Sequence, residues 1–486
     1  MISKVQPSVL IIGCGPAGLG AIEQFKRKGF DVVAYEARDS VGGLWNFDPT
    51  PPPCHVSFDE DGHAIALTDL ERADKPAPAP TPMYAGVTAN TPRDIMPYRS
   101  HPYSKGTAEY PTYKVIYQYQ QHHATKYADH IQLNRVVTRV RQTPDDHPSS
   151  KRWLVEWTPS VTSKSADVGK TFEEDFDHVV VANGSDSRPF IPYVDGLWEW
   201  KGSILHSRWY RNAEAFAGKA SPSLTRNFPC LQANTATDRY GRADLVRELG
   251  MLCVEQSPLA PRKIYRSLRV KPRYDTEHEK GWNKHIHNVA APIHTVEPPS
   301  DKSATGRITT IKQEILDDVD VIIFATGFVF RFDFCRRTDA PFDKAPLLRN
   351  PDVPREARRP PKNLVAQAEL QGGHRVHNLD SHQIFYLPDP TLAFLLLHAE
   401  AIPWPFSEMQ ARVVASYWSG VSLELTPHPE EDSDSHSILV LGHPGGFEYA
   451  EKMLKLIGEG GPEEIDAEGR WGAWPAWKQH IRQLID

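Results

Sequence analysis

The sequence predicts an α/β fold of two or three domains, in which a parallel sheet carries a dinucleotide near its amino-terminal end. The first observation is length, because 486 residues exceed what a single hydrophobic core usually holds. The second is the run Val9–Ile12, four branched apolar residues typical of a strand buried on both faces of a parallel sheet. The third is the glycine-rich stretch Gly13–Gly18, which follows that run directly and opens a helix.

The glycines of this stretch have separate tasks. Gly13 permits the tight turn, Gly15 lets the backbone approach a pyrophosphate, and Gly18 lets the helix pack against the strand. The helix presents free N–H groups and its positive dipole end to that phosphate. The next predicted strand ends at Glu36, the acid expected to hold ribose hydroxyls. The alternative is a structural βαβ unit with accidental glycines, but the complete order of strand, glycines, helix, strand and acid favours a bound dinucleotide.

Composition and charge narrow the class of protein. The net charge of −7 leaves no basic surface, so nucleic acid is not an expected partner. Five scattered cysteines without metal-ligand spacing indicate a reducing compartment, interpreted as the cytoplasm, and no disulfide framework. The first strand begins within ten residues, which leaves no room for a signal peptide, and no apolar run reaches the roughly 18 residues of a membrane span. We expect a soluble, intracellular chain.

Further stretches are read from their local pattern. Gly43-Leu44-Trp45, just after the acid, suggests backbone close beside a flat ligand, or else a glycine turn with a core tryptophan. Residues 48–82 are rich in proline and are expected to form an extended or partly disordered loop without chemistry. Asn90, taken alone, reads as a turn residue that caps the following helix.

The middle of the chain shows alternating helical and strand patterns. Residues 112–127 have helical spacing, and residues 131–140 and 153–157 alternate as antiparallel strands of a small hairpin layer. Residues 176–184 read as another buried strand that ends at a glycine. Residues 321–324 are expected to return the chain to the first domain.

A second motif makes a family resemblance specific. The chain reads W-x-G-x-x-x-H-x-x-x-Y from Trp200 to Tyr210. This resembles the signature F-x-G-x-x-x-H-x-x-x-(F/Y) of the flavin-containing monooxygenases, with Trp200 in place of the first Phe. The likeness runs from Val9 to about Trp418 and is nearest to soluble fungal-type members, N,N-dimethylaniline monooxygenase-like enzymes. The further matching positions are Gly43–Trp45, Asn90, Gly202, His206, Phe324–Phe328 and Ile384–Phe394.

The resemblance implies two Rossmann-like domains. A larger FAD-binding domain, residues 1–188 and 323–486 with a C-terminal helical appendage, would be interrupted by a smaller NADPH-binding domain, residues 189–322. The residues implied to hold FAD are Gly13, Gly15, Gly18, Glu36, Gly43, Leu44, Trp45, Val137, Thr326 and Gly327. NADPH would meet Ser267 and Arg269, whose guanidinium suits a 2′-phosphate; the alternative interpretation of Arg269 is a surface charge.

The implied activity is oxygenation of soft nucleophiles, amine nitrogen or sulfide or thiol sulfur, with NADPH and O2 through a C4a-hydroperoxyflavin. Asn90 is implied as the catalytic amide that orients NADP⁺ and the peroxide, and His206 as a structural residue where the domains meet, neither acid nor base. The partners are a small-molecule nucleophile and O2, and the resemblance is compatible with a homodimer.

Two alternatives remain open at this point. A Baeyer–Villiger-type monooxygenase has a related signature that ends in Trp, whereas Tyr210 stands here. An NADPH-incompetent or non-catalytic flavoprotein is suggested by the atypical nucleotide loop at residues 219–242, where the family's apolar strand is absent, two prolines intervene and only Gly241 remains of the glycines. That stretch reads either as a degraded site or as a gene-model fault such as a retained intron.

The C-terminal part completes the predictions. His374, His377 and His382 invite a metal interpretation, but their spacing fits no compact site, so no metal is predicted and packing beside the flavin is favoured. Residues 393–397 and 402–405 are expected to line the substrate face. Residues 407–419 have helical spacing, and the tryptophan-rich end is expected to pack as a terminal helical appendage.

Overall fold

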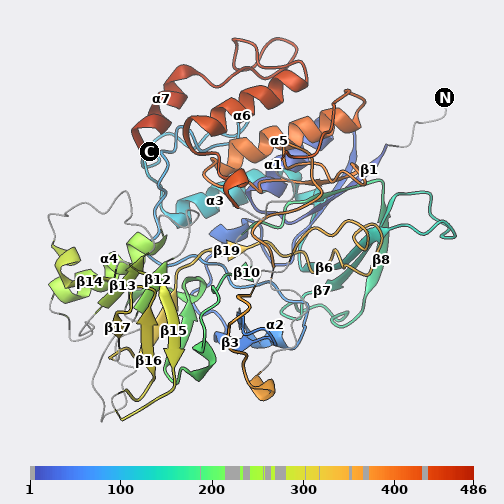
Figure 1. Cartoon of the computed structure of the whole chain (residues 1–486). Coiled ribbons are helices and arrows are strands. Elements are labelled where there is room, and N and C mark those ends of the chain that lie inside the picture. The colour runs from blue at the N-terminus through green and yellow to red at the C-terminus, as the bar shows by residue number, and fades with distance from the viewer. Residues whose placement is uncertain are drawn as a thin grey trace.

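Two five-stranded parallel sheets organise the molecule. Figure 1 shows the computed structural model of the whole chain. The structure describes residues 6–185, 188–213, 230–233, 241–255, 257, 264–268, 281–289, 291–301, 303–316, 318–349, 353–364, 372–429 and 436–485. Among these residues, no helix has both the length and the apolar character needed to cross a lipid bilayer.

The first sheet joins strands from distant parts of the chain, all parallel to their neighbours. In spatial order they are β20 (Leu392–Phe394), β9 (His178–Val181), β1 (Ser8–Ile12), β2 (Asp31–Tyr35) and β5 (Ile131–Gln132). All five residues of β1 are buried, as expected for the central strand of a sheet covered on both faces. The predicted strand at residues 176–184 is β9, which pairs with β1.

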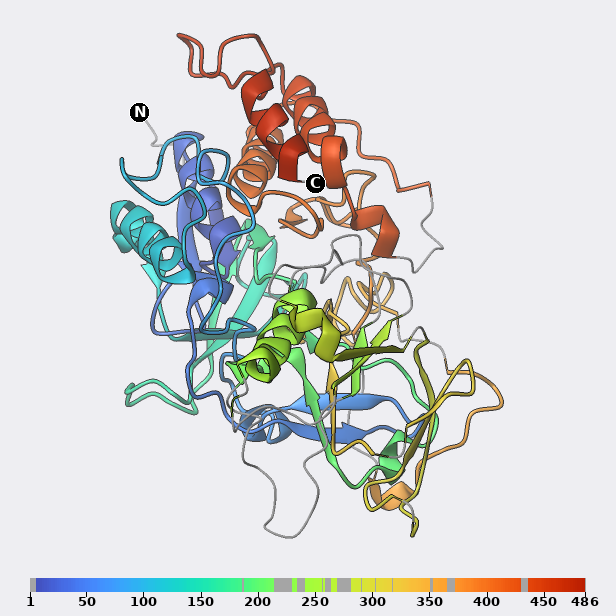
Figure 2. The same ribbon diagram turned by 90° about the vertical axis from the view of Figure 1, so that its left-hand side faces the viewer.

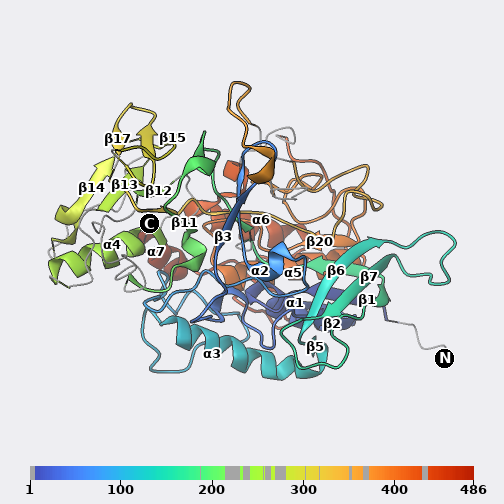
Figure 3. The ribbon, with the colours of Figure 1, turned by 90° about the horizontal axis from the view of Figure 1, so that it is seen from below.

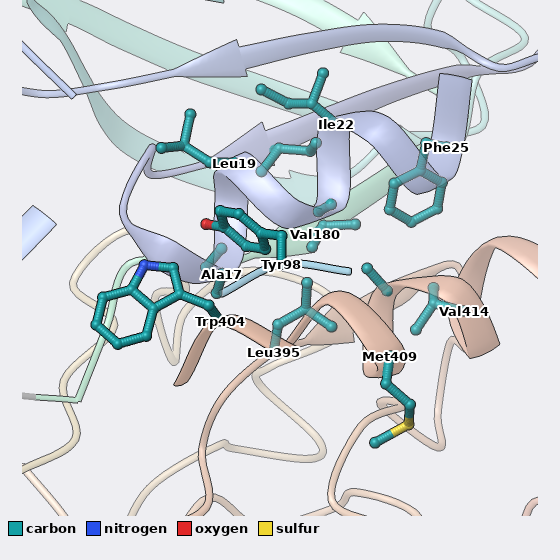
Figure 4. Packing of buried hydrophobic residues seen from close by; sticks show 14 of the residues in the cluster. Ala17, Leu19, Ile22, Phe25, Tyr98, Val180, Leu395, Trp404, Met409 and Val414 are labelled. Atoms are coloured by element: carbon teal, nitrogen blue, oxygen red, sulfur yellow. The ribbon is translucent and has the colours of Figure 1, made fainter. Parts of the chain in front are cut away.

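Two helices pack together over one face of this sheet. Helix α1 (Pro16–Arg27) follows β1, and α5 (Pro403–Trp418) lies against it, so that their apolar side chains interdigitate (Figure 4). The rings of Phe25 and Trp418 stack 5.3 Å apart at this interface. Each fully buried side chain of this size contributes roughly 1.5–3 kcal/mol. The predicted helices at residues 112–127 and 407–419 are confirmed as α3 (Tyr113–Ala124) and α5.

The other face carries an antiparallel layer. It consists of β6 (Arg135–Gln142), β7 (Trp153–Pro159) and β8 (Phe172–Phe176). The predicted hairpin is therefore confirmed, with a third strand added and with Ile131–Gln132 assigned to the first sheet instead. Trp153 is fully buried, and its indole N–H donates to the Thr391 hydroxyl at 2.8 Å.

The second sheet is also parallel throughout. Its order is β11 (Ser203–His206), β18 (Val321–Phe324), β12 (Cys230–Ala233), β13 (Ile264–Leu268) and β14 (Ile286–Val289), with helix α4 (Gly241–Val254) between β12 and β13 in sequence. Two predictions were wrong here. A strand does occupy Cys230–Ala233, directly after the second proline, where proline removes no ladder bond from the strand interior. Residues 321–324 form β18 of this sheet, so the chain does not yet return to the first.

The proline-rich stretch 48–82 is an ordered excursion, contrary to the predicted loop. It contains the hairpin β3 (His55–Phe58) and β4 (Ala64–Leu67) and the short helix α2 (Asp69–Arg72), whose N-terminus is closed by a Thr68–Glu71 capping box. The hairpin lies between the two sheets when the molecule is seen from below (Figure 3). Phe58 and Ala66 pack in one buried cluster with Trp198, and this distant partner orders the segment.

The remaining elements are short strands, the C-terminal helices and several 3₁₀ turns from different parts of the chain. They are β10 (Arg188–Pro189), β15 (Ile293–Glu297), β16 (Arg307–Thr310), β17 (Ile315–Leu316), β19 (Phe328–Val329), α6 (Gly442–Leu456), α7 (Ala476–Ile485) and the 3₁₀ turns η1 (Gly43–Trp45), η2 (Thr125–His130), η3 (Leu197–Glu199), η4 (Ser207–Trp209), η6 (Trp282–His285), η7 (Lys362–Leu364) and η8 (His436–Leu439). Figure 2 places α6 and α7 at the opposite end of the molecule from the β15–β17 layer. The expected C-terminal helices are present. Residues 393 and 394 do not line an open face, because they lie buried in β20.

Candidate functional site

The glycine turn lies at the carboxyl end of β1, where three backbone segments meet. Gly13 has a φ of 101°, and a Cβ there would stand 2.6 Å from the carbonyl oxygen of Ala182. A Cβ on Gly18 would stand 1.9 Å from the carbonyl oxygen of Gly13. Both distances are too short for real atoms, so this close packing of β1, α1 and β9 requires glycine at both positions.

Gly15 and Gly43 face each other across the turn. A Cβ on Gly15 would lie 3.4 Å from the Cα of Gly43, and one on Gly43 would lie 2.9 Å from the Cα of Gly15. Helix α1 begins at Pro16 without a side-chain cap. Its first-turn N–H groups are therefore available to an anion. This backbone cradle fits the diphosphate of a dinucleotide.

Glu36 stands beside the turn at the end of β2. Its buried carboxylate accepts hydrogen bonds from the backbone N–H of Cys14 at 2.8 Å and of Arg38 at 3.0 Å. Burial raises the pKa of this carboxyl, and the two amide donors act against that rise. The structure thus brings Gly13, Gly15 and Glu36 together at the carboxyl edge of one sheet, where dinucleotides bind in α/β folds.

The aromatic residue after the paired glycines meets the C-terminal half of the chain. Leu44 and Trp45 are half-buried in η1, and the Trp45 ring lies 5.7 Å from the ring of Trp404 at the start of α5. The indole of Trp45 packs against the core, as the second interpretation expected, and the Gly43 backbone lies against Gly15 of the cradle. Contact of this stretch with a flat ligand stays a prediction.

Val137 lies next to the acid, but its side chain packs in the core. It is only 9% exposed and belongs to the buried cluster that includes Tyr35. Its strand reaches the cradle through Arg135, whose N–H donates to the carbonyl of Glu36 at 2.9 Å. A role for Val137 toward FAD stays a prediction.

Thr326 and Gly327 lie where the second sheet returns to the first. Gly327 has a φ of 80°, and its carbonyl accepts from the backbone N–H of Phe190 at 3.0 Å. The Thr326 hydroxyl donates to the carbonyl of Phe190. The ring of His374 stands edge-on to Phe190 at 4.5 Å, so this histidine packs beside the same turn.

His206 closes this junction as a structural residue. Its ring is fully buried, Nδ1 accepts from the N–H of Arg208 at 3.1 Å, and Nε2 lies 2.9 Å from the Gly327 carbonyl. Burial lowers the pKa of His206 to about 3. The neutral ring therefore carries its proton on Nε2 and donates to Gly327. The expected structural role is confirmed by this geometry.

Asn90 is exposed at the end of a strip of chain, residues 84–90, that leads to α3. The Thr91 hydroxyl donates to its side-chain oxygen at 3.3 Å. Asn90 does not cap a helix, because the N-cap of α3 is Thr112. The backbone N–H of Ala89 donates to the carbonyl of Pro111 at 2.8 Å and fixes the strip against that helix start.

The second nucleotide site is described in part. Ser267 lies in β13, and its hydroxyl donates to the Ala291 carbonyl at 2.7 Å, inside the protein. Arg269 lies outside the described residues, as do residues 219–229 and 234–240 of the atypical loop. What is described there, β12 followed by α4 and β13 in a parallel sheet, is the strand–helix–strand order of a dinucleotide-binding unit.

Arg208, which our reading of the sequence did not single out, joins the excursion to the signature motif. Its side chain is fully buried, Nε donates to the Pro80 carbonyl at 2.8 Å, and a terminal nitrogen lies 3.6 Å from the Glu71 carboxylate. Burial lowers the pKa of Arg208 to about 10. The sequence did offer one indication of Arg208, because this residue lies inside the signature motif, between His206 and Tyr210.

The three histidines of the C-terminal part do not converge. Within the described residues, no group of three or more His, Cys, Asp or Glu side chains is arranged to hold a metal ion. His377 donates its backbone N–H to the Leu347 carbonyl at 2.8 Å, whereas the ring of His382 lies near Tyr449.

Two parallel sheets, one with a complete glycine cradle and one with a strand–helix–strand unit, define a protein that binds two dinucleotides. Comparison with known proteins also points to dinucleotide binding. Residues 11–71 match the NAD(P)-binding Rossmann-like domain, and residues 71–222 match the flavin-binding monooxygenase-like family. The chain is 26% identical to senecionine N-oxygenase of Tyria jacobaeae over 67% of this chain and 59% of that protein. It is 23% identical to trimethylamine monooxygenase of Roseovarius nubinhibens over 97% of this chain and 90% of that protein.

Among solved structures, S-allyl-L-cysteine S-oxygenase from Allium sativum shares the fold. The TM-score is 0.68 at 19% identity, over 100% of this chain and 93% of that one. The chain is thus similar to the flavin-binding monooxygenase-like family over residues 71–222 and to monooxygenases over most of its length. These similarities support an NADPH-dependent flavin monooxygenase that takes FAD, NADPH, O2 and a small-molecule substrate.

Proposed function

We propose that this enzyme oxygenates soft nucleophiles, the nitrogen of amines or the sulfur of sulfides and thiols. The observation that carries the proposal is the cradle formed by Gly13, Gly15 and Gly43 beside Glu36, which fits FAD. The chain that contains this cradle also resembles the flavin-binding monooxygenase-like family. The relatives support the substrate class, because their names are senecionine N-oxygenase, trimethylamine monooxygenase and S-allyl-L-cysteine S-oxygenase.

The proposed roles of the chain's own residues are to bind the cofactors and to orient their reacting groups. The first-turn amides of α1 would hold the diphosphate, and the Glu36 carboxylate would accept the ribose hydroxyls. Bound FAD and NADPH supply the electrons and the activation of O2. The exposed side-chain amide of Asn90 would orient the nicotinamide and donate a hydrogen bond to the reacting oxygen.

The NADPH side of the site is proposed on the same basis. Arg269 would face the 2′-phosphate end, beyond Ser267, whose buried hydroxyl is bonded to the Ala291 carbonyl. We place one domain limit near residue 188 and the other after Phe324, because the expected limit between residues 322 and 323 falls inside β18 of the second sheet. A cytoplasmic location and a homodimer are also part of the proposal. The free thiols of Cys14, Cys54 and Cys335 support a reducing compartment.

Product analysis tests the function. Holoenzyme with NADPH and O2 is offered trimethylamine, cysteamine and cyclohexanone, and the products are identified by mass spectrometry. We expect an N-oxide or an oxidised sulfur product and no lactone. Lactone formation alone would identify a Baeyer–Villiger enzyme. Flavin that fails to bleach when NADPH is added without oxygen would identify the NADPH-incompetent alternative, which the atypical sequence of residues 219–242 suggests.

A further inference from the structure

The strip of residues 84–90 is held from both halves of the molecule. On the side of the first sheet, the N–H of Tyr113 donates to the Val87 carbonyl at 3.1 Å, next to the bond from Ala89 to Pro111. On the side of the second sheet, the N–H of Ala85 donates to the Arg211 carbonyl at 3.1 Å. Asn90 is therefore carried by a bridge between the two units.

The second anchor of this strip is aromatic. The rings of Tyr84 and Tyr210 meet edge-on with centroids 5.7 Å apart. Tyr210, the last residue of the signature motif, is 3% exposed and packs with Leu245 and Leu249 of α4 in one buried cluster. The signature tyrosine thus lies between the strip and helix α4.

Glu248 of α4 contacts both partners at once. One carboxylate oxygen accepts a hydrogen bond from the Tyr210 hydroxyl. The other would stand 2.8 Å from a Cβ on Gly86, so the carboxylate rests directly against the backbone of the strip. Because Leu245 and Leu249 are fully packed on either side of it along the helix, the position of Glu248 follows the position of α4.

The start of α4 is where a second dinucleotide would act. In a parallel β–α–β unit the phosphates bind at the helix N-terminus, beyond the carboxyl end of the preceding strand. Glu248 is seven residues from Gly241, about 10 Å along the helix axis. Binding at the helix start that favours one placement of α4 therefore also favours one placement of Glu248.

We propose that Glu248 is a positioning residue that links occupancy of the second dinucleotide site to the placement of Asn90. With nucleotide bound, α4 is fixed and Glu248 holds Tyr210 and the Gly86 turn. Without it, the strip depends more on its bonds to Pro111 and Tyr113. The inference rests on the proposed function only for its activity readout.

Hydrogen–deuterium exchange of the FAD-loaded, full-length protein tests the link directly. NADP⁺ should slow exchange in peptides that cover residues 84–90 of the wild type. Glu248→Ala should abolish that slowing, whereas Glu248→Gln should keep most of it, because an amide oxygen still accepts the tyrosine hydroxyl. Glu255→Ala removes an exposed carboxylate just past the same helix and should behave as wild type.

The activity readout uses the same variants. In Glu248→Ala, the share of oxidised NADPH that appears as hydrogen peroxide should rise severalfold. Bound FAD should stay near wild type, which a general loss of structure would not allow. The proposal is overturned if NADP⁺ does not change the exchange rate of residues 84–90 in the wild type. It is also overturned if NADP⁺ slows exchange in Glu248→Ala as much as in the wild type. If the wild-type enzyme oxygenates no nucleophile, the proposed function is wrong. The exchange experiment then still tests the role of Glu248, because it does not depend on turnover.

Discussion

Gly13 holds a backbone conformation that residues with a side chain rarely adopt, and a Cβ there would meet the Ala182 carbonyl at 2.6 Å. Gly13→Ala should therefore yield protein that purifies without flavin, at a cost in stability of about 1–3 kcal/mol. Gly29→Ala is the matched control, because Gly29 also has a positive φ, 82°, but nothing within 4 Å of the added atom. The flavin-to-protein absorbance ratio of each purified variant measures the bound FAD. A Gly13→Ala protein that purifies with flavin would contradict the assignment of the glycine turn as the FAD cradle.

Asn90 provides the second test at the scale of one residue. Because the side chain is exposed and its oxygen accepts a hydrogen bond from the neighbouring Thr91 hydroxyl, Asn90→Ala should retain bound FAD. Losing a single oriented donor should lower the product formed per NADPH by about tenfold or more, with hydrogen peroxide in its place. Asp94→Asn, an exposed change in the same loop, should stay coupled. Normal coupling in Asn90→Ala would remove this residue from the reaction.

Local chemistry explains which site residues were predictable. The glycines and Glu36 could be read from the sequence, because a turn, a helix start and an acid follow one another along 24 residues of chain. Val137 was placed by family likeness, and its side chain lies in the core. Glu248 gives no local signal, since its partners Tyr210 and Gly86 are distant in sequence.

At the scale of elements, long apolar runs were predicted well and short mixed ones were not. Strand β1 and helices α3 and α5 follow their periodicity. The hairpin of β3 and β4 was read as a loop because prolines surround it, whereas distant contacts order it, among them burial against Trp198 and the Glu71–Arg208 pair. Strand β12, with Gln232 among four residues, is specified by its neighbours β13 and β18.

The α1–α5 interface contains a carboxyl group that makes stability depend on pH. Glu408 is 1% exposed and accepts hydrogen bonds from Gln24 Nε2 at 3.2 Å and from the N–H of Arg99 at 3.0 Å. Burial raises the pKa of Glu408 to about 7, against about 4.3 when unfolded. The neighbouring charges are Glu23, which raises this pKa further, and Arg99 and Arg27, which lower it.

The sign of the effect follows from that rise. Below pH 4.3 the group is protonated in both states, and as pH rises to about 7 the unfolded chain releases its proton first, so this contribution to stability is lost. Glu408→Gln should remove the dependence and gain roughly 1–3 kcal/mol relative to wild type between pH 4.5 and 7.5. Denaturant unfolding across that range measures it, with Glu451→Gln on the exposed side of α6 as control. Parallel curves for wild type and Glu408→Gln would contradict the buried-acid account.

At the scale of the whole molecule, the first nucleotide unit is assembled from the two ends of the chain. The cradle residues Gly13 to Trp45 come from the N-terminal part, whereas β20 and α5 come from residues beyond 390. They meet through the pairing of β20 with β9 and through the ring contact of Trp45 with Trp404 at 5.7 Å. A ligand in the cradle therefore binds a site that exists only when both parts are in place.

Removal of FAD should consequently destabilise the protein as a unit. A ligand that binds only the folded state stabilises it by about 2.7 kcal/mol at a free concentration one hundred times its Kd. Apoprotein should unfold at a lower temperature than holoenzyme, and added FAD should restore the difference in a concentration-dependent way. Gly13→Ala should show no response to FAD, whereas Gly29→Ala should respond as wild type does. Differential scanning calorimetry measures the transitions, and an apoprotein whose Tm is indifferent to FAD would show that the glycine turn does not hold the flavin.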